Sequence, residues 1–116
     1  MVCVKDFYGK ILLNIDSGYI KDFYGKILFK FDKEYLRDFY GKILYRFDGD
    51  NIRDFYGSIV LRFDGKNIKE FSGRILYTFD GQNIKPFAGL NMYKVEGFAS
   101  RIELLALFTV LFVNRY

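Results

Sequence analysis

The sequence predicts a mainly β protein, a closed antiparallel β-barrel of twelve strands built from six 16-residue hairpin repeats, with a C-terminal hydrophobic α-helix in the barrel centre. Three observations lead to this fold class. A strict period of 16 residues covers residues 4–99, turn signals recur about every eight residues, and residues 100–116 form an apolar tail. Composition agrees, because 14 Phe and 10 Tyr against one Pro favour pleated sheet.

The repeat is visible by direct alignment of the chain with itself. Five similar units begin at Val4, Ile20, Leu36, Ile52 and Ile68, and a more divergent sixth runs from Ile84 to Ala99. Regularity at this period indicates that each unit is one supersecondary element that needs its neighbours to bury its apolar face. We therefore expect a single domain over residues 1–116, with repeats at 4–99 and a helix at 100–116.

Each unit is predicted to be a β-hairpin. In the fourth unit, residues 52–55 and 58–63 are rich in strand formers and are separated by Tyr56-Gly57. A glycine in such a turn takes positive φ without steric cost. An aspartate three residues before the turn glycine is placed to accept a backbone N–H and hold the turn. These aspartates are Asp6, Asp22, Asp38 and Asp54.

The facing of the strands follows only in part from the pattern. In the second strand of the fourth unit, alternation places Ile59, Leu61 and Phe63 on one face and Val60 and Arg62 on the other. A β-bulge at the turn reverses the facing of one strand relative to its partner. The sequence leaves open whether such a bulge occurs and which way the first strand of each repeat faces.

The tail has the signals of a helix. Ser100 followed by Glu103 forms a capping box, and every residue from 104 to 113 except Thr109 is apolar. A helix without a polar face must be enclosed on all sides. About ten apolar residues are too few for a bilayer span, which needs about 20, so no transmembrane span is expected. A final strand is the alternative, since residues 109–113 are also strand formers.

Closure of the sheet gives this helix a place. An open sheet of twelve strands would leave two edges and an exposed apolar face. Strands about 4.8 Å apart and tilted about 40° close into a barrel with a radius of about 12 Å. A helix is about 10–12 Å across, so the apolar tail fits the space inside.

The chain resembles the Tubby-like barrel superfamily, with its LURP-one-related and phospholipid-scramblase branches. The resemblance covers residues 4–116. Its carriers are the aliphatic-x-Asp-x-x-Gly units at Ile20–Gly25, Leu36–Gly41 and Ile52–Gly57, the apolar-basic-apolar strands after them, and the tail from Ser100. It implies a twelve-stranded barrel around a hydrophobic C-terminal helix. It also implies binding of phosphoinositides or other phospholipids.

The most regular polar feature is the second position of each repeat, which is basic in all six. This candidate anion- or lipid-binding set is Lys5, Lys21, Arg37, Arg53, Lys69 and Lys85. In a closed barrel it forms a ring. A second basic set is Lys10, Lys26, Lys42 and Arg74, and a third is Lys30, Arg46, Arg62 and Lys94.

Acidic rows beside these basic sets favour a plainer interpretation. One row is Asp6, Asp22, Asp38, Asp54 and Glu70, and the other is Asp16, Asp32, Asp48, Asp64, Asp80 and Glu96. Interleaved rows of opposite charge are typical of a solvated outer face with cross-strand ion pairs.

A row of phenylalanines accompanies the basic residues. Its members are Phe7, Phe23, Phe39, Phe55, Phe71 and Phe87. Aromatic rows of this kind can stack nucleic-acid bases, but they more often pack inside a barrel. We therefore expect barrel packing and no nucleic-acid partner.

The sequence favours a protein that is not an enzyme. It has no His, its one Cys is Cys3, and it has no glycine-rich phosphate loop or serine elbow. A repeated array gives most carboxylates the same surroundings, whereas an acid–base pair needs different ones. Asp-rich turns such as residues 48–51 lack the ligand spacing of a calcium loop. We expect no catalytic residues, no cofactor and no bound metal.

The function expected from these features is a non-enzymatic binding or scaffold module that recognises anionic lipid headgroups or an acidic protein. A net charge of +4 supports an anionic partner. The alternative is a structural subunit of a homo-oligomeric or larger assembly with no small-molecule ligand. Near-identity of the repeats is also compatible with recent duplication or design without an evolved ligand. A lone Cys and no signal-peptide pattern favour a cytoplasmic location.

Overall fold

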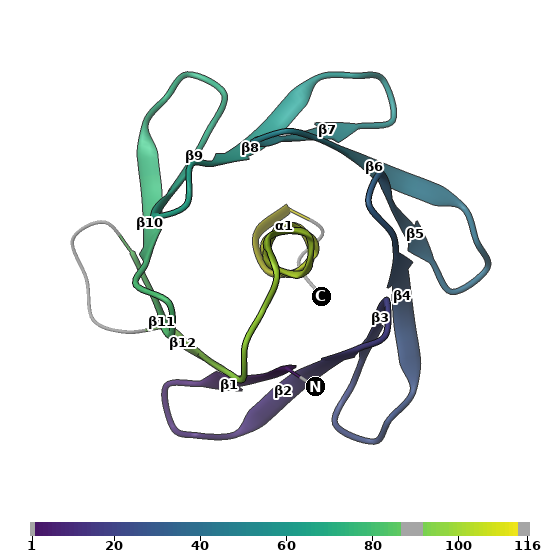
Figure 1. The fold of residues 1–116 in the computed structure, drawn as a ribbon, viewed down its shortest axis with the longest axis vertical. Coiled ribbons are helices and arrows are strands. Elements are labelled where there is room, and N and C mark those ends of the chain that lie inside the picture. The colour runs from purple at the N-terminus through teal and green to yellow at the C-terminus, as the bar shows by residue number, and fades with distance from the viewer. Residues whose placement is uncertain (1, 87–91, 114–116) are drawn as a thin grey trace.

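The twelve strands form one closed antiparallel barrel in a computed structural model that describes residues 2–86 and 92–113 (Figure 1). Each strand pairs with its sequence neighbour, and β1 pairs with β12 to close the ring. The strands are β1 (Val2–Asp6), β2 (Ile11–Asp16), β3 (Tyr19–Lys21), β4 (Ile27–Phe31), β5 (Tyr35–Asp38), β6 (Ile43–Asp48), β7 (Asn51–Asp54), β8 (Ile59–Phe63), β9 (Asn67–Lys69), β10 (Ile75–Phe79), β11 (Asn83–Pro86) and β12 (Tyr93–Glu96). The predicted fold class is confirmed.

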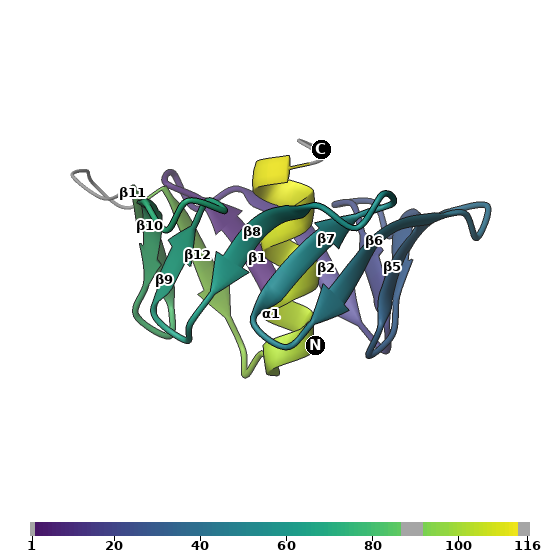
Figure 2. The same cartoon turned by 90° about the horizontal axis from the view of Figure 1, so that it is seen from above.

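The barrel is a short, wide disc with extents of 37 × 34 × 21 Å. Figure 2 shows its two rims from the side. We call the rim formed by the loops within each repeat, such as residues 55–58, the hairpin rim. We call the rim formed by the turns between repeats, such as residues 64–67, the junction rim.

The structure decides the facing that the sequence left open. The first residue of every repeat is fully buried in the barrel interior, and these residues are Val4, Ile20, Leu36, Ile52, Ile68 and Ile84. Because side chains alternate along a strand, the basic residue that follows each of them faces outward.

A β-bulge occurs in each of the first five hairpins. In the fourth, Ile52 lies opposite Leu61 and Arg53 lies opposite Ile59, which leaves Val60 as the extra residue. Val60 packs against the buried core, whereas Ile59 is not part of it. The prediction that Ile59 shares a face with Leu61 and Phe63 is therefore wrong, because the bulge interrupts the alternation between them.

The turn prediction is confirmed. Asp54 Oδ1 accepts hydrogen bonds from the backbone N–H of Tyr56 at 2.9 Å and of Ser58 at 3.0 Å. Gly57 has φ +90°, a conformation that only glycine adopts without strain. The same pair of bonds is made by Asp6, Asp22 and Asp38.

The tail is a helix on the barrel axis, so the alternative of a final strand is wrong (Figure 1). It comprises α1 (Arg101–Phe108) and a π-helical continuation, η1 (Thr109–Val113). Ser100 and Glu103 form the predicted capping box. The helix runs from the junction rim to the hairpin rim (Figure 2).

Aromatic rings link this helix to the barrel wall. The ring of Phe108 lies edge-on to Phe63 with centroids 4.9 Å apart, and Phe112 stacks on Tyr77 at 4.0 Å. Thr109 is the only fully buried polar side chain among the residues described, and its hydroxyl donates to the carbonyl of Leu105 at 2.8 Å. The apolar tail thus fills the barrel that its own repeats create.

Candidate functional site

The predicted basic set lies on the outer wall of the barrel. Lys5, Lys21, Arg37, Arg53, Lys69 and Lys85 are all half-buried and belong to the six odd-numbered strands. They therefore surround the barrel at one level.

A second basic row lies directly opposite the first. The cross-strand pairs include Arg37 with Lys30 and Arg53 with Arg46. Two further pairs of this kind are Lys69 with Arg62 and Lys5 with Lys94. Lys21 and Lys85 lie instead opposite Asn14 and Thr78. Ten basic residues thus form a band around the barrel, interrupted at Asn14 and Thr78. We call it the waist belt, and it comprises Lys5, Lys21, Lys30, Arg37, Arg46, Arg53, Arg62, Lys69, Lys85 and Lys94.

Carboxylates at the junction rim neutralise part of this belt. Arg37 Nη1 lies 2.8 Å from Asp32 Oδ2, and Arg53 Nε lies 3.1 Å from Asp48 Oδ2. Equivalent ion pairs join Lys69 to Asp64 at 3.2 Å and Lys5 to Glu96 at 2.7 Å. The sequence interpretation of a solvated outer face with ion pairs is therefore correct for four of the six predicted residues.

The turn backbone also acts on these carboxylates. The pKa of Asp32 is lowered chiefly by hydrogen bonds from the backbone N–H of Glu34 and Tyr35, with Arg37 adding to the effect. The pKa of Asp64 is lowered in the same way by Asn67 and Lys66. These groups stay ionised at neutral pH and keep the junction rim acidic.

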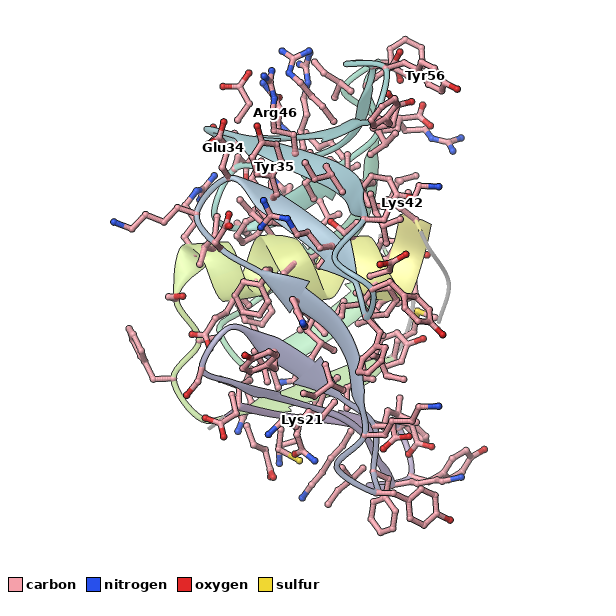
Figure 3. All side chains as sticks on the ribbon, turned by 90° about the vertical axis from the view of Figure 1, so that its right-hand side faces the viewer. Lys21, Glu34, Tyr35, Lys42, Arg46 and Tyr56 are labelled. Atoms are coloured by element: carbon pink, nitrogen blue, oxygen red, sulfur yellow. The ribbon has the colours of Figure 1, made fainter. Side chains whose placement is uncertain are left out.

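The second row of the belt, on the even-numbered strands, has fewer carboxylate partners than the first. Within the described residues, Lys30, Arg46 and Arg62 have no carboxylate oxygen within 4 Å. Figure 3 shows Arg46 on the outside of the wall, away from the helix. Among the described residues, the ten cations of the belt have only four carboxylate partners, so the belt carries a net positive potential.

The remaining basic set lies on the hairpin rim. Lys10, Lys26, Lys42 and Arg74 each directly follow a turn glycine and are exposed. Arg74 Nε lies 3.4 Å from Glu70 Oε1. Lys42 and Tyr56 lie at the end of the barrel where the helix terminates, and Glu34 lies at the other end (Figure 3).

The phenylalanine row corrects the sequence interpretation. These rings were expected to pack inside the barrel, but those of Phe7, Phe23, Phe39, Phe55 and Phe71 are 51–72% exposed. They occupy the centre of a tight turn, beyond the last cross-strand pair, where no neighbouring strand is available to cover them. Phe87 lies outside the described residues.

Sequence reasoning missed the tyrosines beside these rings. Tyr8, Tyr24, Tyr40 and Tyr56 are 89–90% exposed, and each lies edge-on to its neighbouring phenylalanine with centroids 5.3–5.6 Å apart. The signal was present in the sequence, since the two central residues of an Asp-x-x-Gly turn project from the end of a hairpin.

Shallow grooves separate neighbouring hairpins at this rim. One, of about 300 Å³, is lined by Lys10, Leu12, Phe23, Tyr93 and Leu111 among others. An equivalent groove of about 360 Å³ lies between the third and fourth repeats. Aromatic, aliphatic and basic side chains line both grooves together.

In residues 2–86 and 92–113, no cluster of three or more Cys, Asp or Glu side chains has the geometry to hold a metal ion. In the same part of the chain, no helix is long and apolar enough to cross a bilayer.

No protein-family model, curated protein or solved structure matches the chain significantly.

Proposed function

We propose that the protein is a non-enzymatic module that binds anionic membrane surfaces through its hairpin rim. The observation that carries this proposal is an axial separation of charge. The junction rim holds nine of the 14 carboxylates, namely Asp16, Asp32, Glu34, Asp48, Asp50, Asp64, Asp80, Glu96 and Glu103. The waist belt and the hairpin rim hold 14 of the 18 basic residues.

This separation orients the molecule in an electric field. A negatively charged surface attracts the belt and repels the junction rim, so it draws the hairpin-rim end of the barrel toward itself. The hairpin rim itself is close to neutral, because its five carboxylates, one at each of the first five loops, offset its four cations. The net attraction therefore comes from the waist belt. The cations Lys10, Lys26 and Lys42 project from the same loops.

The shape of the molecule favours the rim over the wall as the contact surface. A flat bilayer reaches only two or three strands of a cylindrical belt, but it reaches the whole circumference of a rim. The rim cations then lie within the screening length of about 8 Å at physiological salt, and each basic residue near an anionic surface contributes about 1 kcal/mol. We assign the waist belt, with the predicted second-position residues, the role of a longer-range attractive field.

The resemblance to Tubby-like barrels supports the same ligand class, since it implies phospholipid binding. The cytoplasmic location expected from the sequence agrees with it, because the anionic leaflet of most cell membranes faces the cytoplasm.

Vesicle co-sedimentation tests the proposal. We expect the protein to pellet with vesicles of phosphatidylcholine and phosphatidylserine, to remain in solution with phosphatidylcholine alone, and to be released as salt rises from about 0.05 M to about 0.5 M. The variant K26E/K42E should lose most of this binding. The matched control K33E/K66E makes the same charge change at the junction rim and should bind as the wild type does.

Equal pelleting with both kinds of vesicle, or insensitivity to salt, would refute the anionic-surface proposal. Equal losses in the two charge variants would show that only net charge matters, and the rim would not be the contact surface.

A second candidate function is a structural subunit that self-assembles, and the exposed aromatic rings of the hairpin rim favour it. Light scattering distinguishes the two. A concentration-dependent oligomer at about 10 µM supports assembly, and a monomer at that concentration contradicts it.

A further inference from the structure

We infer that the hairpin rim is a shallow membrane-insertion face, in which the aromatic loop tips enter the bilayer interface around the apolar end of the central helix. This inference rests on the proposed function and deepens it by specifying the depth and orientation of binding. The tips form a set that we call the aromatic crown, which comprises Phe7, Tyr8, Phe23, Tyr24, Phe39, Tyr40, Phe55, Tyr56 and Phe71.

The crown concentrates the exposed apolar surface of the protein in one place. Nine of the ten large hydrophobic side chains that are exposed among the described residues belong to it. The tenth, Phe98, lies near the other rim, between β12 and α1. Scattered exposed apolar residues are normal, but nine exposed rings on one rim, at the tips of neighbouring loops, mark an interaction surface.

The tips are also held in position. Asp22 Oδ1 accepts from the backbone N–H of Tyr24 and of Lys26, both at 2.9 Å, and Gly25 closes the turn with φ +86°. The Phe23 and Tyr24 rings contact each other edge to face. A surface ordered in advance loses little conformational entropy on binding, so apolar burial contributes more fully to affinity.

The crown has the shape of a flat annulus. The hairpin loops splay outward from the barrel wall (Figure 1), and the helix ends within the ring that they form (Figure 2). At that end Leu111, Phe112 and Val113 are partly exposed. A planar target therefore meets aromatic rings at its edge and an apolar helix end at its centre, over a disc of 37 × 34 Å.

The order of residues in each loop corresponds to the layers of a membrane interface. In the second repeat Phe23 is purely apolar, Tyr24 carries a phenol, and Lys26 carries a positive charge. Aromatic side chains with a polar group concentrate at the headgroup level, phenylalanine enters the acyl boundary, and lysine contacts anionic headgroups. Repetition of the same loop around the ring suits a fluid surface that looks the same in every direction.

Charge argues against a second copy of the chain as the occupant. Crown-to-crown stacking would bring together two ends that are each backed by a waist belt of ten cations with only four carboxylate partners in the described part of the chain, and like charges repel. An anionic bilayer offers the complementary charge. The barrel is therefore expected to rest with its helix axis along the membrane normal and its acidic junction rim facing away.

A fluorescent reporter tests insertion directly. The chain has no tryptophan, so the variant F39W places a single fluorophore in the crown, and F98W places one near the opposite rim. With phosphatidylserine-containing vesicles we expect the tryptophan emission of F39W to shift to shorter wavelength and to be quenched by lipids brominated along the acyl chain. We expect neither for F98W.

A binding measurement provides the second readout. F23S/F39S should reduce the vesicle partition coefficient about tenfold or more, because two apolar rings no longer leave water. F98S, a matched removal of an exposed phenylalanine, should change it by less than about twofold. Circular dichroism of each variant verifies that the fold is kept.

The outcomes separate this inference from the proposed function. If the wild type pellets with anionic vesicles but F39W shows no shift and F23S/F39S binds normally, insertion is refuted and surface binding remains. If the wild type binds no vesicles, the proposed function fails. A blue shift of F39W that follows protein concentration without vesicles would identify a second copy as the occupant and overturn the inference.

Discussion

A single carboxylate oxygen organises each of the first four hairpin tips. In the fourth repeat Asp54 Oδ1 accepts from two backbone N–H groups, and the backbone N–H of Gly57 donates to the Asp54 carbonyl at 3.0 Å. The turn therefore exposes its two central side chains while its polar backbone groups remain paired. This arrangement permits Phe55 and Tyr56 to project outward on a short loop.

Removal of this acceptor should weaken the hairpin. We expect D54A to lower the free energy of unfolding by about 1 kcal/mol, because two N–H groups lose their protein acceptor and must bond to water. D54N keeps an oxygen at the same place and should lose less. Urea unfolding measures both, and equal losses in the two variants would contradict a role for the oxygen.

The junction carboxylates predict how stability depends on pH. The turn backbone lowers the pKa values of Asp32, Asp64 and Asp80. A lowered pKa in the folded state contributes stability that is complete above the unfolded pKa of about 3.9 and is lost as the pH falls through the folded pKa. We expect the urea midpoint to fall from pH 6 to pH 3, and to fall less in D64N. A midpoint that rises on acidification would contradict this sign.

At the scale of elements, the central helix and the barrel wall depend on each other. The helix has no polar face, and the inner faces of the strands are apolar, so neither surface is stable in water alone. Phe108 is fully buried and contacts Phe63 and Phe79, with ring centroids 4.9 and 5.9 Å away. It joins three segments that are far apart in sequence.

Truncation of this ring should be among the most damaging single changes. We expect F108A to lower the free energy of unfolding by about 3–5 kcal/mol, since it leaves a cavity that the closed wall cannot collapse to fill. T109V is the neighbouring control. It removes a hydroxyl that bonds only within the helix and should change stability by less than about 1 kcal/mol. A loss below about 1 kcal/mol for F108A would show that the helix is not tightly enclosed.

For the whole molecule, the number of repeats determines the diameter. With twelve strands the wall lies about 12 Å from the axis, and with ten strands it would lie about 10 Å away. The helix and its large side chains fill the space between the barrel axis and the wall. The count of six repeats therefore matches the size of the tail.

Deletion of one complete repeat, residues 20–35, tests this relation. We expect the shortened chain to lose cooperative thermal unfolding or to associate, because five hairpins do not leave room for the same helix. An exchange of residues 36–51 with residues 52–67 keeps the strand number and should fold. A monomeric five-repeat chain as stable as the wild type would contradict the size argument.

The 16-residue period, the Asp-x-x-Gly turns and the Ser100–Glu103 capping box are local patterns, and each predicted its element correctly. Barrel closure could also be predicted, because only closure hides both the inner face of the sheet and a helix apolar on all sides. For the candidate site, the sequence identified the basic positions but not their partners. The sequence could not show that Arg53 lies opposite Arg46, nor that Asp48 forms an ion pair with Arg53.

The sequence by itself thus determined the number of hairpins, the turn chemistry and the enclosed helix, because these depend on residues close together in the chain. Only the tertiary structure decided that Phe23 and Tyr24 are exposed, that Val60 replaces Ile59 at the core, and that basic and acidic rows separate along the barrel axis. Those properties depend on register, on the bulge, and on which strand ends meet at a rim. A one-residue shift in pairing changes them while leaving every local pattern intact.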